Sequence, residues 1–149
     1  MDPEAVALRH KFLEVNKRYD AAFKQMATKV NRQPIEIIIM MTMAEKDNLV
    51  SQKELSLLLY ESKQTINSAV KRLQSQGFIK LVTHPDDGRF KLLALTQSGC
   101  QFVIQHRTTI NQVTNQVFDH YTPIQVQQFV SMLNDYVDTL EKHIDNISR

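Results

Sequence analysis

The sequence predicts a mainly α-helical fold with one small β-hairpin near its centre. Three glycines and four prolines occur in 149 residues, less than half of the roughly 12% that these two residue types make up in average proteins. With so few breakers the regular elements are long, and apolar residues recur at the helical spacing of three and four along both flanks. All-β sandwiches, which need many turns, are therefore excluded, as are collagen-like and disordered classes.

Three of the four prolines predict where helices begin, because a first-turn residue has no helical hydrogen bond to lose. Pro3 opens a helix over residues 3–30 with Asp2 as its N-cap. Pro34 opens a second helix that is apolar nearly all round at residues 37–41, which indicates a buried central helix.

Local capping signals predict the next two helices. Ser51 and Glu54 have the spacing of a capping box, in which each side chain binds a free backbone N–H group at the helix start. The inner face of this third helix is expected to carry Leu55, Leu58 and Leu59. Ser62 caps a fourth helix that ends near residue 76, where Gly77 takes the left-handed conformation.

Two short apolar segments, residues 78–83 and 90–95, flank a Pro/Asp/Gly turn and predict a β-hairpin. Thr96 caps a fifth helix that runs to about residue 120, and Thr122-Pro123 opens a sixth. The order α-α-α-α-β-β-α-α, with two short helices before a hairpin, is that of a winged helix-turn-helix.

The outer face of the fourth helix suits a DNA major groove. No acidic residue interrupts residues 62–76, and amides, hydroxyls and lysines can all bind base edges or phosphates. The alternative is an ordinary solvated face, which uses the same residue types. Ile66, Ala69, Val70 and Leu73 form the expected core face; Gln64, Asn67, Ser68 and Lys71 stand opposite, with Lys63, Thr65 and Arg72 at the flanks.

Charge is segregated along the chain although the net charge is only +2. Residues 61–91 contain six basic and three acidic side chains, whereas residues 119–149 contain two basic and five acidic ones. The centre can therefore face phosphates and the C-terminal helix cannot.

The tip of the hairpin is Asp87-Gly88-Arg89. Gly88 allows a tight turn, Arg89 can enter a narrow minor groove where the negative potential is strong, and Asp87 can hold this arginine by an ion pair. An ordinary turn followed by a solvent-exposed arginine is the alternative.

These residues resemble the MarR (multiple antibiotic resistance regulator) family. The wing signature is similar in Asp87-x-Arg89 and Leu93-x-Leu95-Thr96-x-x-Gly99, and the recognition helix and its exit are similar in Thr65-Ile66, Arg72-Leu73 and Gly77-Phe78-Ile79. The resemblance is close over residues 49–99 and extends to the flanks only as helix order and length. Gly88 stands where the family often has a second basic residue.

The resemblance implies a homodimeric transcription factor with one domain over residues 1–149. Residues 34–99 would be the DNA-binding lobe, and residues 1–33 and 100–149 the helical dimerisation lobe. The residues implied to contact DNA are Ser62, Lys63, Gln64, Thr65, Asn67, Ser68 and Lys71 in the major groove and Arg89 in the wing, with Asp87 and Gly88 supporting the wing.

Evidence for an effector or sensor is weaker. Tyr19 and Phe23, with Met40, Met41 and Met43, can line a pocket for a phenolic or lipophilic effector of the kind that the resemblance implies, but their helical spacing favours core packing. Cys100 is expected to be buried and inert. No histidine spacing, phosphate loop or nucleophile motif indicates a metal site, a cofactor or catalysis.

Together with this resemblance, the sequence predicts a cytoplasmic homodimer that binds double-stranded DNA at a palindromic operator and acts as a repressor. Release by a small-molecule effector is a hypothesis that rests on the resemblance alone, because some members of the family respond to such compounds. The N-terminus lacks the pattern of a signal peptide, and no apolar run is long enough for a membrane span. A winged-helix protein-interaction module and a metal- or thiol-gated DNA-binding switch stay open as alternatives.

Overall fold

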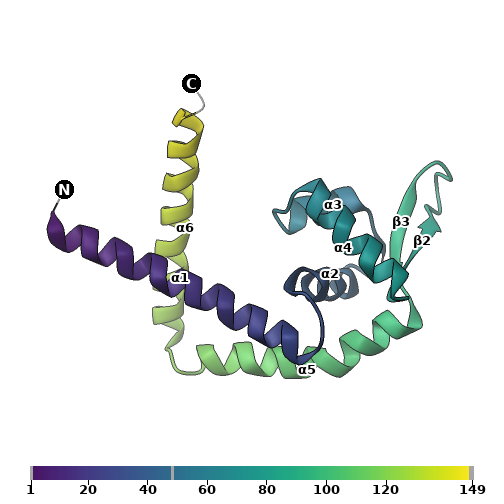
Figure 1. Cartoon of the computed structure of the whole chain (residues 1–149), viewed down its shortest axis with the longest axis horizontal. Coiled ribbons are helices and arrows are strands. Elements are labelled where there is room, and N and C mark those ends of the chain that lie inside the picture. Colours follow the sequence, from purple (N-terminus) through teal and green to yellow (C-terminus); the bar gives the residue numbers. More distant parts are fainter. Residues whose placement is uncertain (1, 48, 148–149) are drawn as a thin grey trace. The chain divides into compact units, whose positions relative to one another are not determined.

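The computed structural model describes residues 2–47 and 49–147 and confirms the mainly helical winged-helix fold (Figure 1). The chain divides into two compact units, Met1–Arg107 and Thr108–Arg149, and each is described by itself. The elements in order are α1 (Pro3–Lys29), α2 (Pro34–Glu45), β1 (Leu49–Val50), α3 (Gln52–Leu58), α4 (Lys63–Ser75), β2 (Ile79–Thr83), β3 (Lys91–Leu95), α5 (Gln97–Phe118) and α6 (Pro123–Ile147).

The core of the first unit lies around α2, as its apolar sequence predicts. This helix contacts α1, α4 and β3. Ile39, Met40 and Met43 are fully buried, because a helix with apolar residues on nearly every side is stable only when it is surrounded. The predicted inner face of α4 is likewise buried, at Ile66, Ala69, Val70 and Leu73.

The sheet has three strands rather than the two of the predicted hairpin. Strand β1 pairs antiparallel with β3, with Leu49 opposite Ala94 and Val50 opposite Leu93, so the order is β1-β3-β2. A strand of two residues shows no alternation of apolar and polar positions, which is why the sequence pattern did not reveal it. The β2–β3 hairpin extends beyond the helices as the wing (Figure 1).

The predicted N-caps are confirmed. Asp2 accepts a hydrogen bond from the N–H of Glu4, and Ser62 accepts one from the N–H of Thr65. The Ser51–Glu54 capping box is complete, and hydrogen bonds from the backbone and hydroxyl of Ser51 hold the pKa of Glu54 below its usual value. The predicted inner face of α3 is wrong in one position: Leu55 is buried, but Leu58 is exposed.

The first turns of α5 pack through aromatic rings on the segment that follows α4. Phe102 is buried and meets Phe78 edge to face, with ring centroids 5.9 Å apart. The guanidinium of Arg32 lies 4.2 Å from the centroid of the Phe78 ring and donates from Nη1 to Oε1 of Gln76 over 2.7 Å. Cys100 is half-buried rather than fully buried as expected.

The second unit leaves its apolar side chains uncovered. Helix α6 has no buried residue, although apolar residues recur along it every three or four positions. Phe129, Leu133, Val137, Leu140 and Ile144 are all exposed. In the described part of the chain, no helix combines the length and the apolar character needed to cross a membrane.

Candidate nucleic-acid interface

The outward face of α4 displays the residues that were predicted to contact DNA. Ser62, Lys63, Gln64, Ser68 and Lys71 are exposed, and Thr65 and Asn67 are half-buried on the same helix. All stand away from the buried Ile66 and Leu73. The face is therefore preformed and does not need to be uncovered before it can bind.

The hydroxyls and amides on this face differ in how free they are. Oγ of Ser62 accepts from the N–H of Thr65 and lies 2.8 Å from Oγ1 of Thr65, so both hydroxyls take part in the helix cap. The side chains of Gln64 and Asn67 form no hydrogen bond with any described residue. Their amides are thus available for a bidentate contact with an adenine edge.

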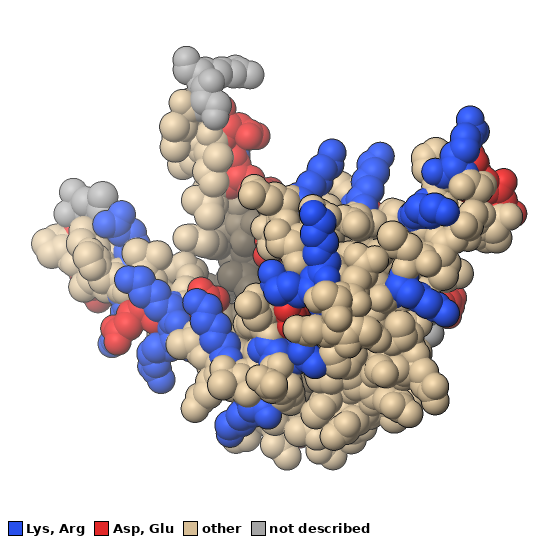
Figure 2. Space-filling model, turned by 45° about the vertical axis from the view of Figure 1, so that its right-hand side comes forward, with Lys and Arg blue, Asp and Glu red and all other residues tan. Residues whose placement is uncertain are grey.

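Basic side chains stand on the surface around α4 and the wing (Figure 2). Within α4 the lysines Lys63 and Lys71 are exposed and no Asp or Glu is present. A solvated helix normally mixes both charges, because i,i+4 ion pairs stabilise it. This face therefore has no intrahelical ion pair, and both of its exposed charged side chains are positive.

The predicted ion pair at the wing tip is confirmed. Nη2 of Arg89 lies 3.0 Å from Oδ2 of Asp87, and Nε lies 3.1 Å from Oδ1. Oδ1 of Asp87 also accepts from the N–H of Arg89 over 3.0 Å. These bonds lower the pKa of Asp87 and raise that of Arg89. The Arg89 side chain is nevertheless 87% exposed, so the aspartate orients the guanidinium without covering it.

Gly88 plays a smaller part in this tip than the sequence indicated. It does not adopt the left-handed conformation, and a Cβ atom there would meet only the Cγ2 atom of Thr83 at 3.7 Å, an ordinary contact. The turn therefore does not depend on a conformation that only glycine reaches.

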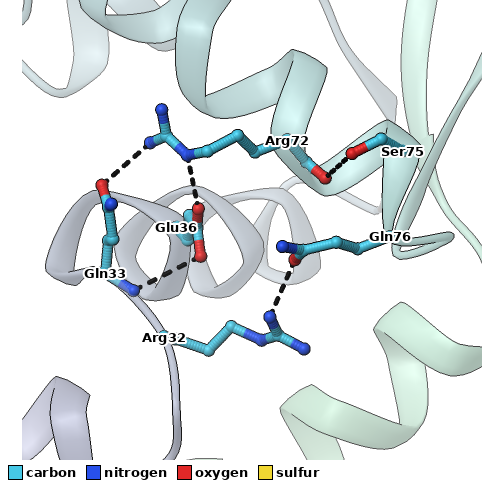
Figure 3. Close-up of polar contacts among 6 residues, drawn as sticks. All are labelled: Arg32, Gln33, Glu36, Arg72, Ser75 and Gln76. Atoms are coloured by element: carbon cyan, nitrogen blue, oxygen red, sulfur yellow. Dashed lines mark hydrogen bonds and ion pairs between the residues drawn. The ribbon is translucent and has the colours of Figure 1, made fainter.

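Arg72 does not contribute to the exposed outer face of α4, although the sequence placed it at the flank of that face. Its Nε atom donates to Oε1 of Glu36 over 2.8 Å, and its Nη2 atom donates to Oε1 of Gln33 over 3.0 Å (Figure 3). Oε2 of Glu36 accepts from the N–H of Gln33 over 3.3 Å. These contacts tie α4 to the first turn of α2 and so fix the orientation of the exposed face.

The sequence carried only part of the signal for this network. Glu36 stands three residues after Gln33, the spacing of a capping box, and this was a signal that the sequence-based prediction missed. Its pairing with Arg72 joins residues 36 positions apart, and only the fold brings them together.

The residues proposed for an effector pocket do not share one surface. Met40 and Met43 are fully buried in the core, whereas Tyr19 is 64% exposed and pairs with Phe23 at 5.5 Å between ring centroids. The methionines therefore act as core packing. Within residues 2–47 and 49–147, no three His, Cys, Asp or Glu side chains gather in a way that could hold a metal ion.

A helix-turn-helix followed by a projecting hairpin, with a basic outer face, defines a winged-helix protein. Residues 30–89 match the model of the MarR family, which confirms the family resemblance that the sequence motifs indicated. A comparison of the sequence with curated proteins found no significant match.

Solved structures of this family share the fold over nearly the whole chain. AbsC, a MarR family transcriptional regulator from Streptomyces coelicolor, has a TM-score of 0.81 at 14% identity, with 95% of this chain and 97% of that chain covered. A second MarR family transcriptional regulator from Streptomyces coelicolor, solved in complex with DNA, has a TM-score of 0.80 at 18% identity, covering 94% and 89%. A MarR family regulator from Neisseria meningitidis has 0.76 at 20% identity, covering 94% and 97%.

Proposed function

We propose that this chain is a sequence-specific, double-stranded DNA-binding transcriptional regulator that acts in the cytoplasm as a homodimeric repressor, without enzymatic activity. The observation that carries the proposal is the exposed, acid-free face of α4 beside the projecting Arg89. Such a face matches the donors, acceptors and charge of a major groove, and the wing can reach the adjacent minor groove. Residues 34–99 form the DNA-binding lobe in this proposal.

Each group on the interface has a distinct part in binding. Gln64 and Asn67 bind adenine edges through their free amides. The hydroxyl of Ser68 can bind either a donor or an acceptor on a base edge. Lys63 and Lys71 bind phosphate or guanine, while Ser62 and Thr65 keep the helix N-terminus in place. Arg89, held by Asp87, enters or flanks the minor groove.

The exposed apolar stripes support a homodimer. The stripe of α6 and the exposed Leu8, Leu13 and Tyr19 of α1 would leave much apolar surface in water if the chain stayed alone. A second copy covers such faces when residues 1–33 and 100–149 form the dimerisation lobe. Two recognition helices then meet half-sites about one helical turn, ~10 base pairs, apart on a palindromic operator.

A mobility-shift titration with the duplex upstream of the chain's own gene tests this function. We expect a shifted complex that a shuffled duplex of equal length does not compete away. Equal, weak affinity for every duplex would contradict the proposal and favour a winged-helix protein-interaction module.

The same titration tests regulation. A structural relative from Bordetella bronchiseptica has its DNA binding regulated by 6-hydroxynicotinic acid, so small phenolic or aromatic acids are the first effectors to add. Release by such a compound is the expected result. A response to chelator or peroxide instead would identify a metal- or thiol-gated switch.

Substituting the wing arginine tests the minor-groove contact. Arg89→Ala is expected to weaken binding and to flatten the slope of log K against log salt by about 0.9 per protomer, because one phosphate-proximal charge is lost. Lys142→Ala, which removes an exposed charge from α6, is the matched control and should leave the slope unchanged. Equal slopes for Arg89→Ala and the wild type would refute the wing assignment.

Substituting an amide on α4 tests base reading. Gln64→Ala or Asn67→Ala is expected to cost ~1–3 kcal/mol at one base position and little elsewhere, since a bidentate amide contact discriminates a single base pair. Binding to a library of operators with single base changes measures this loss. A uniform decrease over all sequences would mean that these side chains touch only the DNA backbone.

A further inference from the structure

After each of the helices α1 to α4, the second residue that follows adopts the left-handed conformation. The residues are Asn31, Asp47, Tyr60 and Gly77, with φ of 52°, 54°, 53° and 78°. Glycine adopts this conformation without cost, and Asn and Asp tolerate it because their short side chains can bind the backbone locally. A bulky aromatic residue does not, so Tyr60 is the outlier among them.

The turn that contains Tyr60 is held by backbone bonds that any residue could make. The N–H of Tyr60 donates to the carbonyl of Leu57 over 3.4 Å, and the N–H of Glu61 donates to the carbonyl of Ser56 over 3.1 Å. Oγ of Ser56 also donates to the carbonyl of Glu61 over 2.6 Å. Glycine at position 60 would satisfy the same bonds without strain.

The side chain of Tyr60 does not stabilise the fold by packing. It is 95% exposed, the largest exposed fraction among the large apolar and aromatic residues of the described chain. Neither packing nor the turn therefore explains a tyrosine here. Because no contact of the side chain offsets the strained backbone conformation, a binding role is the better explanation for this tyrosine.

Position 60 lies two residues before Ser62, the N-cap of α4. The N-terminal end of a recognition helix is the part that comes nearest to the DNA, and tyrosine hydroxyls are among the donors that bind phosphate oxygens. The Ser56–Glu61 bonds hold the backbone of the turn, and the exposed side chain of Tyr60 is free to reach a bound partner.

We propose that Tyr60 donates its phenol hydroxyl to a phosphate oxygen of the bound DNA and so anchors the N-terminus of α4 on the backbone. This inference rests on the proposed function. A phosphate contact fixes the register of the helix and carries no base preference of its own. The exposed Leu57 and Leu58 are close to Tyr60 in sequence and could form part of a protein-binding surface with its ring. Such a surface would not need the phenol hydroxyl, so the two roles can be distinguished.

Two variants separate the hydroxyl from the backbone. Tyr60→Phe keeps the ring and removes the donor, and Tyr60→Gly relieves the strained conformation. Affinity for the operator duplex and for a shuffled duplex is measured by fluorescence anisotropy at several salt concentrations, together with Tm. Tyr121→Phe, at an exposed tyrosine of the second unit, is the matched control.

We expect both Tyr60 variants to raise the Kd about tenfold for each duplex, the lower end of the cost of one lost hydrogen bond to a charged group. The salt slope should stay unchanged because no charge is removed, unlike the result for Arg89→Ala. The Tm of Tyr60→Gly should equal or exceed that of the wild type.

Wild-type affinity in Tyr60→Phe would overturn the phosphate contact, whether or not Tyr60→Gly binds more weakly. A lower Tm for Tyr60→Gly would also overturn it, since the ring would then have a structural role. Failure of the wild-type chain to bind any duplex would instead refute the proposed function itself, so the two failures are distinguishable.

Discussion

Replacing Arg72 by alanine is expected to lower the free energy of unfolding by roughly 2–3 kcal/mol and to weaken the proposed DNA binding, although Arg72 is not on the exposed face of α4 that is proposed to contact DNA. The substitution leaves Glu36, whose side chain is only 4% exposed, without its cation. Loss of one partner of a buried pair costs about 3–5 kcal/mol. We expect less because the Arg72 side chain is 38% exposed and solvent screens the pair.

Urea denaturation measures this loss, and Lys71→Ala is the matched control. Lys71 neighbours Arg72 on α4 but is exposed and forms no ion pair with the described residues, so its effect on stability should stay within about 0.5 kcal/mol. The double variant Glu36→Leu with Arg72→Met should recover most of the stability, because apolar groups of similar volume replace both charges. Equal stability of Arg72→Ala and Lys71→Ala would show that the pair does not hold α4 on α2.

Gly99→Ala is expected to destabilise the fold by about 2–4 kcal/mol through a steric clash. A Cβ atom at this position would overlap the carbonyl oxygen of Phe78 and lie 3.0 Å from Cδ2 of Leu95. The carbonyl is backbone and already accepts from the N–H of Thr96 over 3.0 Å, so it cannot move without breaking that bond. The start of α5 must therefore shift away from the wing.

Gly88→Ala is the matched control for this prediction. A Cβ atom at Gly88 meets only Thr83, at an ordinary distance of 3.7 Å, so the same chemical change should alter the free energy of unfolding by about 0.5 kcal/mol or less. Similar urea midpoints for the two variants would contradict the close approach of α5 to Phe78.

The sequence predicted the elements whose signals are local. Ser51 with Glu54, Ser62, and Pro34 mark helix starts within a few residues, and Gly77 marks a helix end, so each could be placed without knowing the fold. The wing ion pair belongs to the same class, because Asp87 and Arg89 are two residues apart.

The features that the sequence did not reveal depend on distant residues or on backbone conformation. Strand β1 exists because Leu49 pairs with Ala94, and Arg72 turns inward because Glu36 lies across from it in the folded chain. The left-handed Tyr60 was equally invisible, since a tyrosine gives no sign of a positive φ. The sequence pattern could not show that Leu58 is exposed while Leu55 is buried, because both are leucines on one short helix.

Hydroxyl-radical footprinting of the wild-type protein on the duplex upstream of its own gene tests the central claim most directly. Two recognition helices in one dimer should protect two windows about one helical turn, ~10 base pairs, apart on the same side of the duplex. Protection at the flanking minor grooves should fade in Arg89→Ala. A single protected window, or protection that does not depend on sequence, would contradict a dimer that reads a palindromic operator.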